Sequence, residues 1–230
     1  MIAGVDGCRG GWLVARAVGW PCDRAPELLV GRTFNDVLTM TAACDIVMVD
    51  MPIGLPDGAT PRRCDIEAQD MLGRAGRHSV FPAPPRSALT AATPTAFQAL
   101  YRRACGKGAP VPLWGIVPKI LEVDAAMSPG LQDRIREVHP ELAWRRLAGS
   151  ILPSKKTGAG LEARVRLLSS SIHGIDEVLR SRPRGARPDD VLDALVALSV
   201  AADVAAGQTR RTCREEPPRD ARGLRMEICY

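Results

Sequence analysis

Four aspartates have the residue type and spacing of a centre that binds divalent metal. Asp6 and Asp50 each follow a short apolar run, and Asp190 and Asp193 lie three residues apart at the start of an apolar segment. Adjacent parallel strands lie about 4.8 Å apart, so carboxylates that end two such strands can face each other. Two like charges so placed repel unless a cation lies between them. Hard oxygen ligands favour Mg²⁺ or Mn²⁺ over zinc.

Each of these aspartates also has a structural explanation. Asp6 can stabilise the glycine turn that follows it, and Asp50 can bind backbone amides. Asp190 lies in a first helical turn, where a carboxylate stabilises the helix dipole by roughly 0.3–1 kcal/mol. Asp193 lies beyond the usual capping position on a segment that is apolar almost all round, so it is expected to be buried and to need a partner. The sequence thus favours metal ligation by all four.

A second cluster is Glu137-Val138-His139-Pro140-Glu141. Alternation along a strand would place Glu137, His139 and Glu141 on one side. His139 can ligate metal, act as a base or orient water, and it can equally be a hydrogen-bonded core histidine. We predict that Glu137 and His139 support catalysis, with Glu141 as a further outer residue.

Basic residues supply candidates for binding phosphate. Lys155 and Lys156, between Ser154 and Thr157, can clamp a phosphate, although a lysine pair in a loop is often simply solvated. The sequence contains no GxxxxGK[ST] or GxGxxG loop. The other candidates for substrate binding are Arg62, Arg63 and Lys119.

The elements that must position these residues begin with a predicted hairpin. Apolar runs at residues 1–5 and 12–18 flank a glycine-rich turn, and a third strand is expected at 27–34. Asn35 can cap a helix over 36–43, and 46–49 forms a strand buried on both faces. A helical crossover joins parallel neighbours, so this strand is expected to run parallel to the first.

The remainder divides into an insertion and a closing region. Residues 54–130 are rich in proline and arginine, which predicts a partly helical insertion in a single domain of residues 1–230. After it we expect a strand at 134–138, helices at 142–147, 161–169 and 190–206, and a terminal strand at 224–230.

Composition excludes some classes of function. The 230 residues are 46% hydrophobic, which is ordinary for a globular protein. The start MIAGVDGCRGGWLV lacks the pattern of a signal peptide, and the seven cysteines are never spaced as CxxC, so a reduced, cytoplasmic chain without a zinc site is expected. A net charge of +5 suits a polyanionic partner, whereas 4% aromatic content argues against base stacking.

The order of the predicted elements, with an acid on the first strand, an acid after the fourth and a late DxxD helix, resembles the ribonuclease H-like fold. The match to one family is closer. The chain resembles the uncharacterised family called domain of unknown function 429, described as predicted ribonuclease H-like nucleases. Seven segments carry the resemblance, in the order GVDGCRGGW, VDMPIGLP, RRCDIEAQDMLG, SVFPAPPR, PKILEVD, EVHPE and SKKTGAG.

The resemblance implies a nuclease that hydrolyses phosphodiester bonds of structured or branched nucleic acid. Two Mg²⁺ or Mn²⁺ ions about 3.5–4 Å apart would be bridged by Asp6, with Asp50, Asp190 and Asp193 as the other ligands. Related resolvases usually have Glu on the fourth strand, so the shorter Asp50 would hold its metal closer to the backbone. A homodimer is also implied by the likeness to resolvases, which cut two symmetric strands.

Two other classes of function stay open at this point. Actin-like ATPases and sugar kinases share the same core and hold ATP phosphates on an Asp-Gly hairpin, but they normally need two such cores. A non-catalytic binding protein would keep the acidic centre for stability alone. Fold does not determine function, so these alternatives must be separated at the site.

Overall fold

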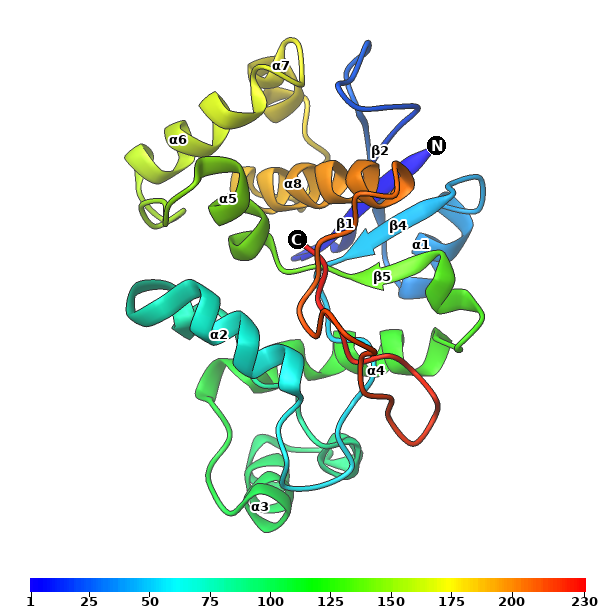
Figure 1. The fold of residues 1–230 in the computed structure, drawn as a ribbon, viewed down its shortest axis with the longest axis vertical. Coiled ribbons are helices and arrows are strands. Elements are labelled where there is room, and N and C mark those ends of the chain that lie inside the picture. Colours follow the sequence, from blue (N-terminus) through cyan, green and yellow to red (C-terminus); the bar gives the residue numbers. More distant parts are fainter. The chain divides into compact units, whose positions relative to one another are not determined.

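The computed structural model describes all residues, 1–230, which fold as two compact units. The first unit comprises Met1–Met51, Arg134–Arg210 and Cys229–Tyr230, and the second comprises Pro52–Asp133 and Arg211–Ile228 (Figure 1). Each unit is therefore built from segments that lie far apart in the sequence. The four aspartates all belong to the first unit.

The first unit is built on a five-stranded mixed sheet with the order β3-β2-β1-β4-β5. The first three strands are antiparallel neighbours, whereas β4 runs parallel to β1 and β5 runs parallel to β4. The predicted hairpin, third strand and parallel fourth strand are confirmed. The strands are β1 (Ile2–Cys8), β2 (Gly11–Ala17), β3 (Glu27–Gly31), β4 (Ile46–Val49) and β5 (Ile135–Glu137).

Helix α1 (Phe34–Met40) starts earlier than predicted because Thr33, not Asn35, is its cap. The Thr33 hydroxyl accepts a hydrogen bond from the Asp36 amide at 3.3 Å, and the Asp36 carboxylate accepts one from the Thr33 amide at 3.0 Å. Such a reciprocal capping box satisfies two backbone donors at once. A threonine three residues before an acid therefore outweighs the nearer asparagine.

The other helices of the first unit lie close to their predicted positions, while two predicted strands change. Helix α7 was not predicted, the strand at 134–138 shortens to β5, and the terminal strand at 224–230 is wrong. Only isolated bridges occur there, Val138 with Cys229 and Arg219 with Arg225, because no neighbouring strand continues the ladder. The helices are α5 (Pro140–Ala148), α6 (Gly158–Leu168), α7 (Ile175–Arg180) and α8 (Pro188–Ala205).

Helix α8 packs on the sheet at unusually short range. Figure 1 shows it crossing β1 and β4. A Cβ atom added at Gly4 in β1 would lie 2.1 Å from the Ala194 carbonyl oxygen and 2.3 Å from the Leu198 amide nitrogen. The helix backbone thus rests directly on the strand, which only glycine permits. This contact fixes the height and register of α8 over β1.

Gly4→Ala is expected to lower the free energy of unfolding by about 1–3 kcal/mol or more, because α8 must lift off the sheet to admit the methyl group. Urea denaturation measures this change. Gly19→Ala is the matched control, since a Cβ atom there meets nothing within 4 Å. Equal urea midpoints for Gly4→Ala and Gly19→Ala would contradict the close contact between β1 and α8.

The second unit is helical and rich in loops, as predicted for the insertion. Its α-helices are α2 (Arg63–Gly76), α3 (Pro94–Cys105) and α4 (Val117–Ala126). Short 3-10 turns connect them, at Arg77–Ser79, Arg86–Thr90, Val111–Ile116 and Leu131–Asp133. No helix of the chain is both long and apolar enough to cross a membrane.

Candidate acidic site

Asp6 and Asp50 meet at the carboxyl ends of β1 and β4. Val5 pairs with Val49 in the parallel register, and the Asp50 amide continues the ladder by donating to the Val5 carbonyl at 2.9 Å. The next residue on each strand is therefore an aspartate. The two side chains share a hydrogen bond, and the Gly7 amide donates to Asp6 Oδ1 at 2.8 Å. The predicted juxtaposition across one strand spacing is confirmed.

The environment of this pair disfavours its negative charge. Burial, followed by repulsion from Asp50 and Asp193, raises the pKa of Asp6 well above its ordinary value. Burial also raises the pKa of Asp50 to about 6, with a further contribution from Asp193 and an opposing one from His139. A hydrogen bond between two carboxyl groups requires that one of them carry a proton. One of the two carboxyl groups is therefore protonated when this hydrogen bond is formed.

Asp193 joins the pair from helix α8. Because Gly4 and Asp6 lie on one face of β1 and the Ala194 backbone lies over Gly4, the preceding residue of the helix faces Asp6. The buried Asp193 carboxylate accepts a hydrogen bond from Trp144 Nε1 at 3.1 Å and forms an ion pair with the Lys155 ammonium. Both of its oxygens are thus fixed by donors.

Lys155 places a positive charge against the acidic cluster. Burial alone would lower its pKa, but the carboxylates of Asp193, Asp6 and Asp50 raise it above its ordinary value. Lys155 was predicted to clamp a phosphate; the structure places its ammonium against Asp193 instead. Its neighbour Lys156 is exposed.

Asp190 caps helix α8 and also lies beside the acidic cluster. Its carboxylate accepts a hydrogen bond from the Arg187 amide at 2.8 Å, which caps the first turn of α8. It also lies near enough to Asp6 to raise the pKa of that carboxyl group. Burial in turn raises the pKa of Asp190 itself. Capping of α8 therefore explains how the Asp190 carboxylate is oriented, and that carboxylate still lies beside Asp6.

The predicted alternation of Glu137, His139 and Glu141 is wrong. β5 ends at Glu137, and His139 is already the N-cap residue of α5, so a strand period no longer applies. His139 nevertheless lies beside the site, because its charge lowers the pKa of Asp50. Glu137 is buried at the end of β5, next to β4. Proline at position 140 starts a helix, which ends the strand early.

Glu141 belongs to a supporting network on the helices. Its carboxylate receives two hydrogen bonds from Arg164, at 2.8 and 3.0 Å, which join α5 to α6. The buried Arg164 guanidinium lies 5.6 Å from the centre of the Trp144 ring, a cation–π distance. Because Trp144 donates to Asp193, this network holds the acidic cluster in place.

Sequence reasoning missed Trp144 and Arg164 for different reasons. A tryptophan at helical spacing is usually a core residue, and its indole donor has no signature of its own. Arginine is seldom fully buried unless it is paired, and no local pattern links Arg164 to Glu141 across 23 residues. The contacts of Trp144 with Asp193 and of Arg164 with Glu141 both depend on how the helices pack.

The donor set fits a divalent metal in its chemistry. Asp6, Asp50, Asp190 and Asp193 offer only hard carboxylate oxygens, the ligands that Mg²⁺ and Mn²⁺ prefer. As the side chains stand, no group of three or more His, Cys, Asp or Glu residues has the arrangement that holds a metal ion. The raised pKa values of Asp6 and Asp50 express a surplus of negative charge that a cation would relieve.

The arginines predicted to bind substrate belong to the second unit and are engaged in ion pairs. Arg62 is only 2% exposed; its Nε donates to Asp65 Oδ2 at 3.1 Å, and its Nη1 donates to the carbonyls of Ile53 and Gly54. Arg63 pairs with Glu67 at 2.7 Å. Arg62 was predicted to bind substrate, but the structure buries its guanidinium against Asp65 and these carbonyls. Lys119 lies half-buried on α4.

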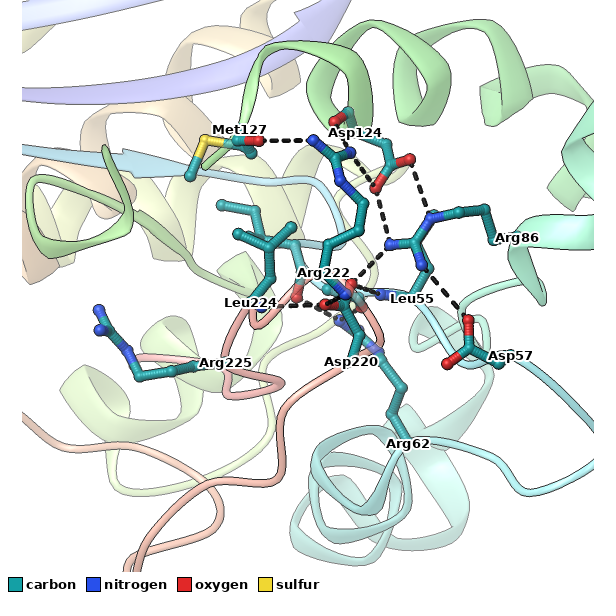
Figure 2. A network of polar contacts seen from close by, with 12 residues as sticks. Leu55, Asp57, Arg62, Arg86, Asp124, Met127, Asp220, Arg222, Leu224 and Arg225 are labelled. Atoms are coloured by element: carbon teal, nitrogen blue, oxygen red, sulfur yellow. Dashed lines mark hydrogen bonds and ion pairs between the residues drawn. The ribbon is translucent and has the colours of Figure 1, made fainter. Parts of the chain in front are cut away.

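A third arginine of this unit, Arg86, lies among three aspartates in a network that sequence reasoning also missed (Figure 2). Its guanidinium donates to Asp124 and Asp220, and it lies 3.4 Å from Asp57. Asp220 also accepts from the Leu55 amide at 3.1 Å. Burial would raise the pKa of Asp220, but these donors hold it below its ordinary value. The network ties residues near 220 to the insertion.

Comparison with known proteins gives one match. No curated protein and no solved structure matches the chain. Residues 4–218 match the family described as "protein of unknown function (DUF429)", a span that includes the acidic cluster and most of both units. The chain therefore belongs to the DUF429 family.

Proposed function

We propose that the chain is a divalent-metal-dependent nuclease of the ribonuclease H-like type, acting on structured or branched nucleic acid. One observation carries the proposal. Asp6, Asp50 and Asp193 come from three separate elements and converge at the carboxyl ends of two parallel strands, although burial and mutual repulsion oppose their ionisation. Strongly perturbed carboxyl groups of this kind cluster at functional sites.

The sheet supports the assignment of the fold. Three antiparallel leading strands, a fourth strand parallel to the first and an acid at the end of each inner strand agree with the ribonuclease H-like pattern. Ligand sites of open α/β sheets also gather at the carboxyl ends of strands. The position of α8 across β1 brings the DxxD aspartates to the same edge.

In the proposed site, Asp6 and Asp50 would hold a divalent ion in place of the proton that they share. Asp190 and Asp193 would supply further oxygens, while Trp144 keeps Asp193 oriented and Lys155 balances its charge. Mg²⁺ or Mn²⁺ at such a centre lowers the pKa of a bound water and stabilises the charge of the leaving oxygen. His139, beside Asp50, would orient water.

The test is metal-dependent cleavage by the full chain. Labelled four-way DNA junctions, RNA–DNA hybrid and structured RNA are incubated with Mn²⁺, Mg²⁺ or EDTA. We expect cleavage with either metal, a 5′-phosphate on the product, and a higher melting temperature in the presence of metal. Metal that raises the melting temperature while every substrate stays intact would instead indicate a binding protein. Stabilisation by ATP without cleavage would favour phosphotransfer.

A further inference from the structure

Three connecting loops of the first unit border the acidic cluster, and each carries basic residues. The turn between β1 and β2 holds Arg9, three residues after Asp6. The connection between α5 and α6 holds Lys156, directly after the Lys155 that pairs with Asp193. The connection between α7 and α8 holds Arg184, shortly before the first turn of α8. Sequence reasoning singled out only the lysines among these.

Two of these loops are in backbone contact. A Cβ atom added at Gly185 would lie 3.1 Å from the Gly10 Cα, and one added at Gly10 would lie 3.6 Å from the Gly185 Cα. Gly185 also has a φ of 96°, which side chains rarely allow. The β1–β2 turn and the α7–α8 connection are therefore in close backbone contact at Gly10 and Gly185. Arg9 and Arg184, each next to one of these glycines, consequently project from adjoining backbone.

The side chains of Arg9, Arg184 and Lys156 are exposed and form no ion pair. Two arginines close to Arg184 in the sequence are engaged instead: Arg187 pairs with Asp189, and Arg180 pairs with Glu177 at 2.7 Å. An exposed cation without an intramolecular partner can bind a phosphate without first breaking a contact. The loops beside the acidic cluster thus carry three exposed cations, which we call the basic rim.

We propose that this basic rim, consisting of Arg9, Arg184 and Lys156, binds the sugar-phosphate backbone of a nucleic acid on both sides of the phosphate that faces the acidic cluster. The inference rests on the proposed function and names its substrate-binding residues. Guanidinium groups suit phosphate because they donate in a planar fork. Contacts to phosphates position a strand without reading its sequence, in keeping with the low aromatic content of the chain.

The rim differs from the binding residues predicted from the sequence. Arg62 and Arg63 are paired with carboxylates of the second unit, and Lys155 is paired with Asp193. Of the predicted residues, Lys156 belongs to the rim. The rim also explains how an acidic centre could approach a polyanion: the surrounding cations offset the repulsion that Asp6 and Asp50 would exert on phosphates.

The experiment measures binding separately from cleavage. A fluorescein-labelled four-way DNA junction is titrated with the full chain in EDTA, and anisotropy is followed at several salt concentrations. For Arg9→Gln/Arg184→Gln we expect roughly tenfold or greater loss of affinity, and a salt slope smaller by about 0.9 for each phosphate contact removed. The matched control is Arg24→Gln/Arg166→Gln, since both arginines are exposed and form no ion pair. It should bind as wild type does.

The outcomes separate the rim from the catalytic proposal. Wild-type affinity and slope in the rim variant, at an unchanged melting temperature, would overturn the rim even if the protein cleaves nucleic acid. Equal losses in the control variant would also overturn it, because the effect would then reflect net charge alone. If the rim variant loses binding while the wild type never cleaves, the rim stands and the nuclease proposal fails. Failure of the wild type to bind any nucleic acid would sink both.

Discussion

Asp50→Asn is expected to reduce metal-dependent cleavage at least roughly 100-fold and, at the same time, to stabilise the metal-free protein. Loss of even an outer-shell partner of a metal site reduces activity by about 10–100-fold, and Asp50 is proposed as a direct ligand. The gain in stability follows from the crowding of carboxylates. Asparagine keeps the shape and a hydrogen-bond donor for Asp6 while it removes a charge that burial and Asp193 disfavour.

The pH dependence of stability gives this prediction a second signature. The pKa of Asp50 rises from 3.8 to about 6 on folding, so the folded chain binds more protons than the unfolded chain between these values. The free energy of unfolding of the wild type therefore falls as pH rises through this window. Across this window the free energy of unfolding is expected to fall by about 1–3 kcal/mol, because a shift of one pKa unit corresponds to about 1.4 kcal/mol. Asp50→Asn should flatten this dependence.

Urea denaturation in EDTA at mildly acidic and neutral pH measures the stability, and the junction assay with Mn²⁺ measures the cleavage. Asp23→Asn is the control, because Asp23 is exposed and lies outside the cluster. Full cleavage by Asp50→Asn would show that the site is wrongly assigned. Lower stability than wild type at neutral pH would show that the carboxylate has a structural role.

Asp65→Ala is expected to lower the free energy of unfolding of the second unit by about 3–5 kcal/mol. Asp65 is 1% exposed, and its carboxylate binds Arg62 and accepts from the Ala83 amide at 2.9 Å. Removing it leaves the Arg62 guanidinium buried without its counter-charge, which is far more unfavourable than losing an exposed pair. The same guanidinium binds the carbonyls of Ile53 and Gly54, so three chain segments would loosen together.

Glu177→Ala is the matched control, since Glu177 and Arg180 have the same separation of three residues but are both 70% exposed. It should leave the unfolding midpoint unchanged. A second comparison is Arg62→Met/Asp65→Leu, which removes both charges and should recover much of the lost stability. Equal effects of Asp65→Ala and Glu177→Ala would contradict the buried pair.

The predictions that succeeded depended on local patterns. An apolar run followed by an acid predicts a strand, and a parallel crossover then places Asp6 beside Asp50 without any knowledge of packing, although β1 continues past Asp6 to Cys8. A long apolar segment after an acidic turn likewise defined α8. The predictions that failed required knowledge of the next element. His139 does not continue the strand alternation because α5 starts at Pro140. Residues 224–230 form only isolated bridges because they lack a neighbouring strand.

The sequence by itself therefore determined the sheet, its crossover and the meeting of two carboxylates, because strand period and strand order follow from residues close together in the chain. Only the tertiary structure decided how that pair is charged and held. Gly4 lets α8 descend on β1, which brings Asp193 to Asp6; Trp144 and Lys155 then fix Asp193. The contacts of Asp193 with Lys155 and Trp144 join residues 38 and 49 positions apart, where packing and charge rather than local pattern choose the partner.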